Sequence, residues 1–229
     1  MARILIIGGH GKVALLLEPL LVAAGHEVSA VIRRPEQAAE VADTGATPLV
    51  ADITAGDVEA LAELFDGQEV IVWSAGAGGG SAERTYAVDR DAAIRSMDAA
   101  AAAGARRYVM VSYFGAGPDH GVDPSDAFYA YAEAKTAADA HLRETALDWT
   151  ILQPSSLTLD PPTGLINVDD ERGSHVPRAD VAAVIAASIA EPTTIGKTIR
   201  FNTGDLPIAQ ALRAAGGADG GAASGAERA

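Results

Sequence analysis

The chain has 229 residues, of which 48% are hydrophobic, and this length and composition are typical of one α/β domain with a sizeable core. Its formal net charge is −14 and no basic run is longer than the pairs Arg33–Arg34 and Arg106–Arg107, which argues against a nucleic-acid partner. The chain contains no cysteine, and this excludes disulfides, thiolate metal sites and cysteine nucleophiles.

The predicted elements alternate between short β-branched runs and Ala/Leu-rich segments, a pattern typical of βα units that build a parallel sheet. The predicted strands are residues 3–7, 27–32, 47–51, 69–74, 107–112, 149–153 and 198–202. The predicted helices are residues 12–24, 36–43, 57–65, 83–103, 127–146 and 178–190. The order predicts one α/β domain with a three-layer, doubly wound parallel sheet.

Four segments depart from this regular pattern. Pro19 lies inside the first predicted helix and predicts a kink, because proline removes a backbone donor and clashes with the preceding turn. Residues 114–126 and 154–177 are rich in Gly and Pro and are predicted to be loops. The folded domain is predicted to span residues 1–213, and residues 214–229 are predicted to be a disordered tail without a catalytic role, because they are poor in large apolar side chains.

The first residues of the chain bear on its location. The apolar run Ile4–Ile7 is too short for the hydrophobic part of a signal peptide, and no other stretch approaches the length of a membrane span. We therefore expect a cytoplasmic protein with no membrane partner.

A glycine-rich segment follows the first predicted strand and opens the first predicted helix. Its candidate cofactor-binding residues are Gly8, Gly9, His10, Gly11, Lys12 and Val13. Glycines at this place permit a sharp turn and a close approach of a pyrophosphate to the backbone, and the helix N-terminus attracts the anion. The segment therefore predicts a dinucleotide-binding Rossmann fold, the alternative being an ordinary tight βα turn.

The second predicted strand ends at Arg33–Arg34. A protein that prefers NAD usually carries an Asp or Glu there, which accepts a hydrogen bond from the ribose 2′-hydroxyl. Guanidinium groups instead suit the 2′-phosphate of NADP(H) through charge-assisted contacts. We therefore expect NADP(H) to be preferred over NAD(H), with Arg34 more readily than Arg33 a solvated bystander.

Several further segments appear in a characteristic order. They are Val50–Ile53, Trp73–Gly76, Met110–Ser112, Tyr131–Lys135, Asp148–Pro154 and Arg178–Ala182. Together with the glycine-rich segment, they make the chain resemble the small atypical members of the short-chain dehydrogenase/reductase superfamily, which bind NAD(P). The resemblance runs from residue 3 to about residue 212.

This resemblance implies further cofactor contacts. Asp52 and Ile53 would border the adenine, and Ser74, Ala75 and Gly76 would let the backbone pass close to the ribose and phosphates. The nicotinamide would lie against Pro154, Ser155, Ser156 and Leu157. Alternatively, Asp52 caps a turn and the Gly-rich residues 76–80 form a merely flexible loop.

Tyr131 and Lys135 are four residues apart, so a helix places them on one face. The resemblance implies that Lys135 stabilises the Tyr131 phenolate and contacts the nicotinamide ribose, while Ser112 holds the substrate oxygen. Tyr113 and Tyr129 are possible substitutes for Tyr131. The pair can also arise by chance in an Ala-rich helix.

We therefore expect an NADP(H)-dependent reductase of a small carbonyl-like molecule, monomeric or homodimeric, with no bound metal, because the five histidines show no ligand spacing. Residues 155–177 and 200–212 are expected to form a small substrate region, and residues 114–126 to contribute to specificity. One alternative is a non-catalytic NADP(H)-binding redox sensor. Another is an enzyme like the epimerases and dehydratases.

Overall fold

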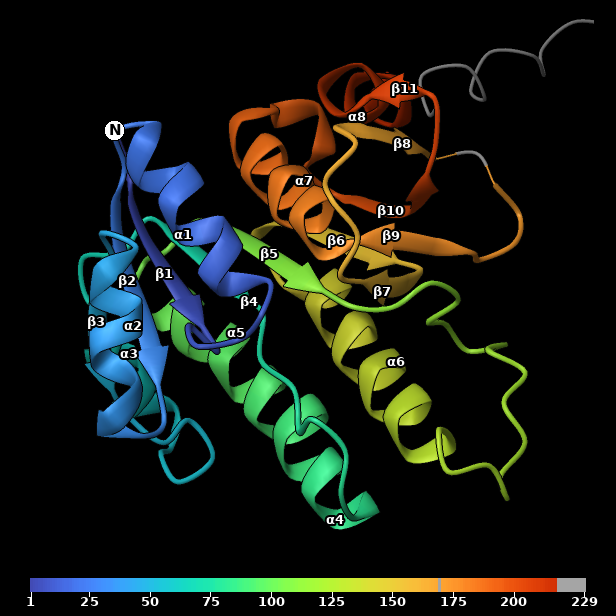
Figure 1. Cartoon of the computed structure of the whole chain (residues 1–229). Helices are drawn as coiled ribbons and strands as arrows, with labels where there is room; N and C mark the ends of the chain where they lie inside the picture. The colour runs from blue at the N-terminus through green and yellow to red at the C-terminus, as the bar shows by residue number, and fades with distance from the viewer. Residues whose placement is uncertain (169, 218–229) are drawn as a thin grey trace, which may run out of the picture.

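The centre of the structure is a nine-stranded sheet with the order β11-β8-β10-β6-β5-β4-β1-β2-β3 (Figure 1). The computed structural model describes residues 1–168 and 170–217. The strands of this sheet are β1 (Arg3–Ile7), β2 (Glu27–Ile32), β3 (Thr47–Val50), β4 (Val70–Trp73), β5 (Arg107–Val111), β6 (Asp148–Pro154), β8 (Leu165–Asn167), β10 (Lys197–Thr203) and β11 (Leu206–Pro207). All seven predicted strands are present, each within one residue of its predicted ends.

The strands from β3 to β10 pair in parallel, and β8 pairs antiparallel with β10 and β11. The chain moves outward from β1 to β2 and β3, then returns to place β4 on the other side of β1. Ligands of doubly wound folds bind at such a reversal, outside the carboxyl ends of the strands. The predicted fold class is therefore confirmed. The two edge strands each contain a proline, Pro48 in β3 and Pro207 in β11.

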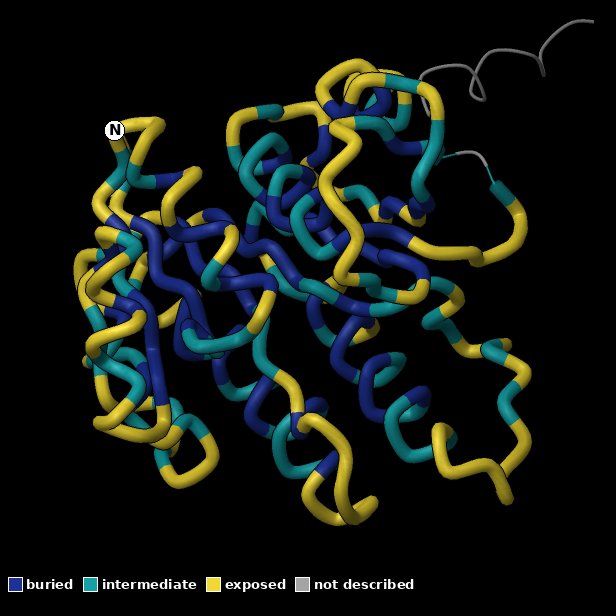
Figure 2. Tube along the Cα trace, in the orientation of Figure 1, coloured by how far each residue is buried: buried dark blue, intermediate teal, exposed yellow. Residues whose placement is uncertain are grey.

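Alternate residues of each central strand face opposite layers of helices. On β1, Ile4 and Ile6 belong to one buried apolar cluster, and Leu5 and Ile7 belong to another. The first cluster includes side chains of α1 (Ala14–Ala23), α2 (Ala38–Asp43), α7 (Arg178–Ala190) and α8 (Ile208–Gly217). The second includes side chains of α3 (Val58–Leu64), α5 (Ala93–Ala102) and α6 (Tyr129–Glu144). Figure 2 shows the buried strands between these two layers.

The predicted loop at residues 154–177 contains three short strands. Besides β8, these are β7 (Ser156–Thr158) and β9 (His175–Pro177), which form a separate parallel pair. The buried carboxylate of Asp180 accepts hydrogen bonds from Thr163 and from the backbone of Gly164. These contacts order a segment whose local sequence predicts only a loop.

Two further predictions concern the ends of helices. The predicted tail begins at residue 214, yet α8 continues to Gly217, because Ala211, Leu212 and Ala215 pack against the first apolar cluster. The prediction for residues 214–217 is therefore wrong, and residues 218–229 lie outside the described residues. Helix α1 continues through Pro19, and the kink there stays a prediction.

The predicted helix 83–103 is a composite element. It begins as α4 (Ala82–Thr85), widens into the π-helical segment η2 (Tyr86–Ala92) and ends as α5. π-helical turns are rare and occur often at functional sites. This segment carries the buried residue Asp89.

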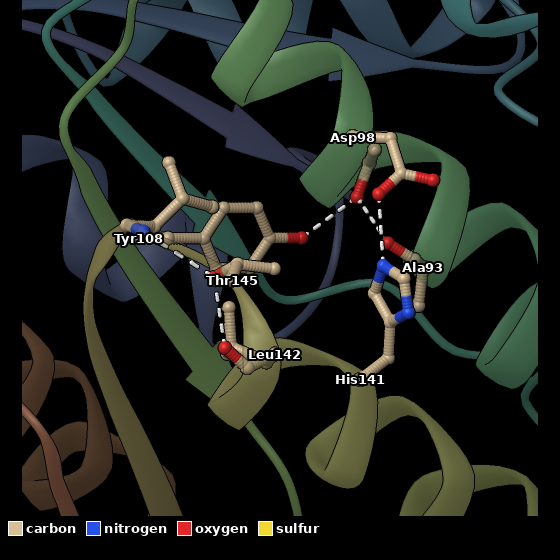
Figure 3. Close-up of polar contacts among 8 residues, drawn as sticks. Ala93, Asp98, Tyr108, His141, Leu142 and Thr145 are labelled. Carbon is tan, nitrogen blue, oxygen red and sulfur yellow. Dashed lines mark hydrogen bonds and ion pairs between the residues drawn. The ribbon is translucent and has the colours of Figure 1, made fainter.

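Buried polar contacts tie β5 to α5 (Figure 3). Ser96 donates its hydroxyl proton to the carbonyl of Ala93, so the Tyr108 phenol donates the 2.7 Å hydrogen bond that joins it to Ser96. A second contact joins α6 to α5, since Nε2 of His141 lies 2.8 Å from a carboxylate oxygen of Asp98.

Replacing Tyr108 with phenylalanine is expected to lower the free energy of unfolding by about 1–2 kcal/mol, because a buried hydroxyl partner is lost. Urea denaturation followed by circular dichroism measures the change. Tyr129→Phe, in a half-buried position, serves as the control and is expected to change stability by less than about 0.5 kcal/mol. Equal midpoints for wild type and Tyr108→Phe would show that this contact contributes nothing.

Candidate functional site

The glycine-rich segment forms a tight turn between β1 and α1. Gly8 has a φ of +87°, and a Cβ there would lie 2.7 Å from the Cα of Ala75 after β4. A Cβ at Gly9 would lie 2.5 Å from the Cβ of Ala30 in β2. Glycine is therefore required at both positions, and the turn leaves bare backbone at the reversal between β1 and β4.

This turn borders a cavity of about 260 Å³. We call it the first cavity. Its walls come from the segments that follow β1, β2, β3 and β4, and from the start of the composite helix. The lining residues are Gly8, His10, Gly11, Val31, Ile32, Arg33, Arg34, Gln37, Ala51, Asp52, Ile53, Thr54, Ser74, Ala75, Gly76, Arg84 and Val88. A backbone cradle without side chains, beside apolar and cationic walls, fits a dinucleotide.

Three arginines line the first cavity. Arg33 and Arg34 follow β2, and Arg84 comes from α4 on the opposite wall. Arg34 forms an exposed ion pair of 3.5 Å with Glu36, whereas Arg33 lies in the electrostatic field of Asp52. The cavity thus offers cationic groups to an anion despite the acidic net charge of the chain.

His10 joins the glycine turn to the segment after β2. Its Nε2 lies 2.6 Å from a carboxylate oxygen of Glu40, and its Nδ1 lies 3.1 Å from the Gln37 amide. Both contacts hold the ring at the cavity wall.

Asp52 closes a turn after β3, as its alternative interpretation suggested. One carboxylate oxygen accepts from the backbone N–H of Thr54 at 2.9 Å and from its hydroxyl at 2.6 Å. These hydrogen bonds hold the pKa of Asp52 below its usual value, with a smaller contribution from Arg33. Asp52 also lines the first cavity, so capping the turn and bordering a ligand are compatible roles.

A second cavity, of about 500 Å³, lies at the ends of β5 and β6. It is lined by Tyr113, Phe114, Phe128, Tyr131, Pro154, Ser155, Ser156, Leu157, Gly173 and Ser174. Three of these rings form one cluster, since the Tyr113, Phe128 and Tyr131 centroids lie 5.1–5.5 Å apart. The cavity therefore has an aromatic wall and a wall of serines and backbone.

The electrostatic surroundings of Tyr131 differ from the expectation. Burial raises the pKa of its phenol, and Asp89, Asp139 and Tyr113 raise it further. These surroundings favour the protonated phenol, whereas the sequence-based expectation was a phenolate stabilised by Lys135. The catalytic roles expected of Tyr131 and Lys135 stay predictions.

Ser112 and Lys135 lie behind the two cavities and do not line either one. The Ser112 hydroxyl donates to Asp139 at 2.7 Å. The Lys135 ammonium donates to the carbonyl of Val111 at 2.8 Å and contacts the sulfur of Met110 at 3.2 Å. Burial lowers the pKa of Lys135, and Asp139 and Asp89 act in the opposite direction.

The comparison with protein families decides the classification, because a model described as NAD(P)H-binding matches residues 8–192. The chain belongs to this NAD(P)H-binding family. A relative named uncharacterized sugar epimerase YhfK, from Bacillus subtilis, is 34% identical over 215 residues, which cover 92% of this chain and 99% of that one.

Solved structures agree with this membership. A putative NAD-dependent epimerase/dehydratase from Bacillus halodurans is 33% identical, with a TM-score of 0.86 over 93% of this chain and 100% of that one. The oxidoreductase ylbE from Lactococcus lactis is 30% identical, with a TM-score of 0.81 over 93% and 95%. ChuY, an anaerobillin reductase from Escherichia coli O157:H7, is 27% identical, with a TM-score of 0.72 over 89% and 98%. The predicted resemblance to atypical short-chain dehydrogenases/reductases is confirmed.

Most of the residues proposed to contact the cofactor of this NAD(P)H-binding protein line one of the two cavities. The first cavity includes Gly8, His10, Gly11, Arg33, Arg34, Asp52, Ile53, Ser74, Ala75 and Gly76. The second includes Pro154, Ser155, Ser156 and Leu157. Gly9 packs against β2, Val13 lies in the core, and Lys12 is exposed outside both cavities.

Sequence reasoning missed Arg84, Gln37 and Phe128 in these walls, and it missed the buried acids Asp89 and Asp139. No local pattern marks them, because their positions depend on how the helices pack on the sheet. Phe128 has one usable signal, since it directly precedes the helix that carries Tyr131.

The described residues contain no cluster of three or more His, Cys, Asp or Glu side chains that would hold a metal ion. In the same residues, no helix has the length and apolar character needed to cross a membrane.

Proposed function

We propose that this chain is an NADPH-dependent reductase of a small carbonyl-like substrate. The observation that carries the proposal is the position of Arg33 and Arg34 at the end of β2, in the wall of the first cavity. A guanidinium there is complementary to a 2′-phosphate, whereas an acid would favour a free 2′-hydroxyl. Arg33 is the stronger candidate, because Arg34 is paired with Glu36.

In this proposal the first cavity binds the adenine, ribose and pyrophosphate of the dinucleotide, and the nicotinamide lies at the second cavity. Gly8 and Gly11 hold the pyrophosphate against the N-terminus of α1, while Asp52 and Ile53 border the adenine. Ser155 and Ser156 lie along the nicotinamide end, beside the second cavity. When bound, the cofactor supplies a hydride.

Tyr131 supplies the proton in the proposed reaction. Its phenol lines the second cavity and is protonated at neutral pH, as a donor to a developing alkoxide must be. The rings of Tyr113 and Phe128 pack on it and fix its orientation. The volume of about 500 Å³ admits a small substrate.

One observation favours a second candidate, a non-catalytic sensor of the dinucleotide. Ser112 and Lys135 already have partners within the protein and do not line the cavities. Such a sensor would bind NADPH and would not turn over carbonyl substrates. The epimerase and dehydratase names of YhfK and the Bacillus halodurans protein support a third candidate, an enzyme like the epimerases and dehydratases, which we rank last.

Titration with NADPH and NADH tests the proposal. Arg33→Ala is expected to raise the Kd for NADPH by about 10- to 100-fold, because a charge-assisted hydrogen bond contributes about 1.5–3 kcal/mol. The Kd for NADH is expected to change less than about twofold, since it has no 2′-phosphate. Nicotinamide fluorescence or calorimetry measures both.

The matched control for this titration is Arg106→Ala, which removes an arginine whose side chain is 85% exposed and lies outside both cavities. It is expected to leave both affinities unchanged. Equal weakening of NADPH and NADH by Arg33→Ala would refute the 2′-phosphate contact, and a wild type that binds neither would refute the proposed function. Turnover of carbonyl compounds then separates the reductase from the sensor.

A further inference from the structure

Three ionisable side chains lie together in the interior behind the cavities. Asp89 of η2 is 1% exposed, and Lys135 and Asp139 of α6 are 1% and 0% exposed. Lys135 interacts electrostatically with both carboxyl groups. If all three were ionised, one negative charge would be buried without compensation, which is costly in a dry interior. One of the two carboxyl groups therefore holds a proton.

The hydrogen-bond partners indicate which carboxyl group this is. Asp139 accepts from the Ser112 hydroxyl at 2.7 Å and from the Gln153 amide at 3.4 Å. Asp89 accepts a single hydrogen bond, from the backbone N–H of Ala77 at 3.0 Å. Donors to a carboxylate stabilise its ionised form. Burial raises the pKa of both carboxyl groups, and these donors favour Asp139 over Asp89 as the ionised partner of Lys135.

The second oxygen of Asp89 lies near the first cavity. This atom, Oδ1, is buried and has no hydrogen-bond partner among the described residues. A Cβ at Gly76 would lie 3.1 Å from it, and Gly76 lines the first cavity. Because Gly76 has no side chain, no Cβ stands between this oxygen and the backbone that lines the cavity.

We propose that Asp89 is a neutral carboxylic acid that donates its O–H to an acceptor oxygen of the ribose–diphosphate portion of a dinucleotide in the first cavity. The proton stays on Asp89, and no covalent bond forms or breaks. This inference rests on the dinucleotide binding of the proposed function and not on turnover. Burial supports it by raising the pKa of Asp89, against a smaller effect of Lys135.

Other ionisable groups on the elements around η2 are engaged or exposed. From α6, Tyr131 and Lys135 interact electrostatically with Asp89. On α4, Glu83 and Arg84 are exposed. On η2, Arg90 pairs with Asp91 and lies over the Tyr86 ring. On α5, Arg95 donates to the carbonyl of Thr54, and Asp98 contacts His141. Ionisation of Asp89 removes the donor and places a negative charge beside the phosphates. Dinucleotide affinity is therefore expected to fall as pH rises through the titration of Asp89.

Carboxyl ¹³C NMR of aspartate-labelled protein tests where the proton lies, with Asp89→Asn used to assign the signal. The Asp89 carboxyl is expected to be protonated at about pH 7 in the wild type and ionised in Asp139→Asn, because Lys135 then needs a counter-ion. An ionised Asp89 in the wild type would overturn the proposal. The wild-type spectrum alone decides this point if Asp139→Asn does not fold.

NADPH titration between about pH 6 and about pH 9 tests the donor. Asp89→Asn keeps an N–H donor in a side chain of similar shape. Its Kd for NADPH is therefore expected to equal that of the wild type at low pH and not to rise with pH as Asp89 ionises. Asp89→Ala is expected to bind about tenfold more weakly at low pH, because the donor is gone. Asp98→Asn, which lies outside both cavities, is the control and is expected to follow the wild type.

The outcomes separate this inference from the proposed function. Equal NADPH affinity of the wild type and Asp89→Ala at low pH would overturn the donor role while leaving NADPH binding intact. A wild type that binds neither NADPH nor NADH would overturn the proposed function and the donor role together, and NMR would still determine whether Asp89 is neutral.

Discussion

Replacing Tyr131 with phenylalanine is expected to lower kcat for NADPH-dependent carbonyl reduction by at least about a hundredfold, because general acid catalysis contributes about 10²–10⁴. The Kd for NADPH is expected to stay within about twofold of the wild type, since the ring and its packing against Tyr113 and Phe128 remain. Stopped-flow single-turnover kinetics measures the chemical step, and fluorescence titration measures binding.

The pH dependence gives this experiment a second readout. Because burial and the nearby Asp139 carboxylate raise the pKa of Tyr131, the phenol is expected to remain an acid throughout the neutral range. Wild-type kcat is therefore expected to show no fall between about pH 6 and about pH 9 that comes from this group. The control is Tyr113→Phe, whose phenol has a pKa raised to about 12 by burial. If Tyr113→Phe loses turnover and Tyr131→Phe does not, the acid is Tyr113.

A large effect on the pH dependence of stability is expected at Glu18, in the middle of α1. Its side chain is fully buried, one oxygen accepts from the Thr44 hydroxyl at 2.8 Å, and the other has no partner among the described residues. Burial raises the pKa of Glu18 from 4.5 to about 7. The folded state therefore binds a proton more tightly than the unfolded state, and its stability falls as pH rises from about 4.5 through about 7.

Glu18→Gln removes this titration and keeps an oxygen for Thr44. The variant is expected to be more stable than the wild type above about pH 7, by up to about 3 kcal/mol, and to differ little below about pH 5. Urea denaturation at about pH 5 and about pH 8 measures the difference. The control is Glu63→Gln, an exposed residue of α3, which is expected to show no such pH-dependent gain. A wild type as stable as Glu18→Gln at about pH 8 would contradict the buried titration.

The regular part of the fold follows from local sequence. The β-branched runs and the helical segments between them predict every strand from β1 to β6 and also β10, because most of these strands are short continuous apolar runs that are buried on both faces. The sequence does not predict β7, β8, β9 and β11, which have only two or three residues each, and the segment around β8 is ordered by distant contacts such as Asp180 with Thr163. A three-residue strand has too few side chains to produce a periodic signal.

In the candidate site, too, some features follow from local sequence and others depend on how distant elements pack. The turn at Gly8 depends on local backbone geometry, and the sequence predicts it. The spacing of Tyr131 and Lys135 predicts a shared helix face, but the direction of each side chain depends on how α6 sits against β5. At that position the Lys135 ammonium donates a hydrogen bond to the carbonyl of Val111. That contact joins residues 24 positions apart, so no local pattern predicts it.

The prolines of the two edge strands limit how copies of this chain can associate. A backbone without an N–H at Pro48 in β3 and Pro207 in β11 interrupts the row of donors that a foreign strand would need. The two prolines therefore oppose the joining of sheets of neighbouring molecules edge to edge through β3 or β11. A homodimer of this protein would have to pair through other surfaces.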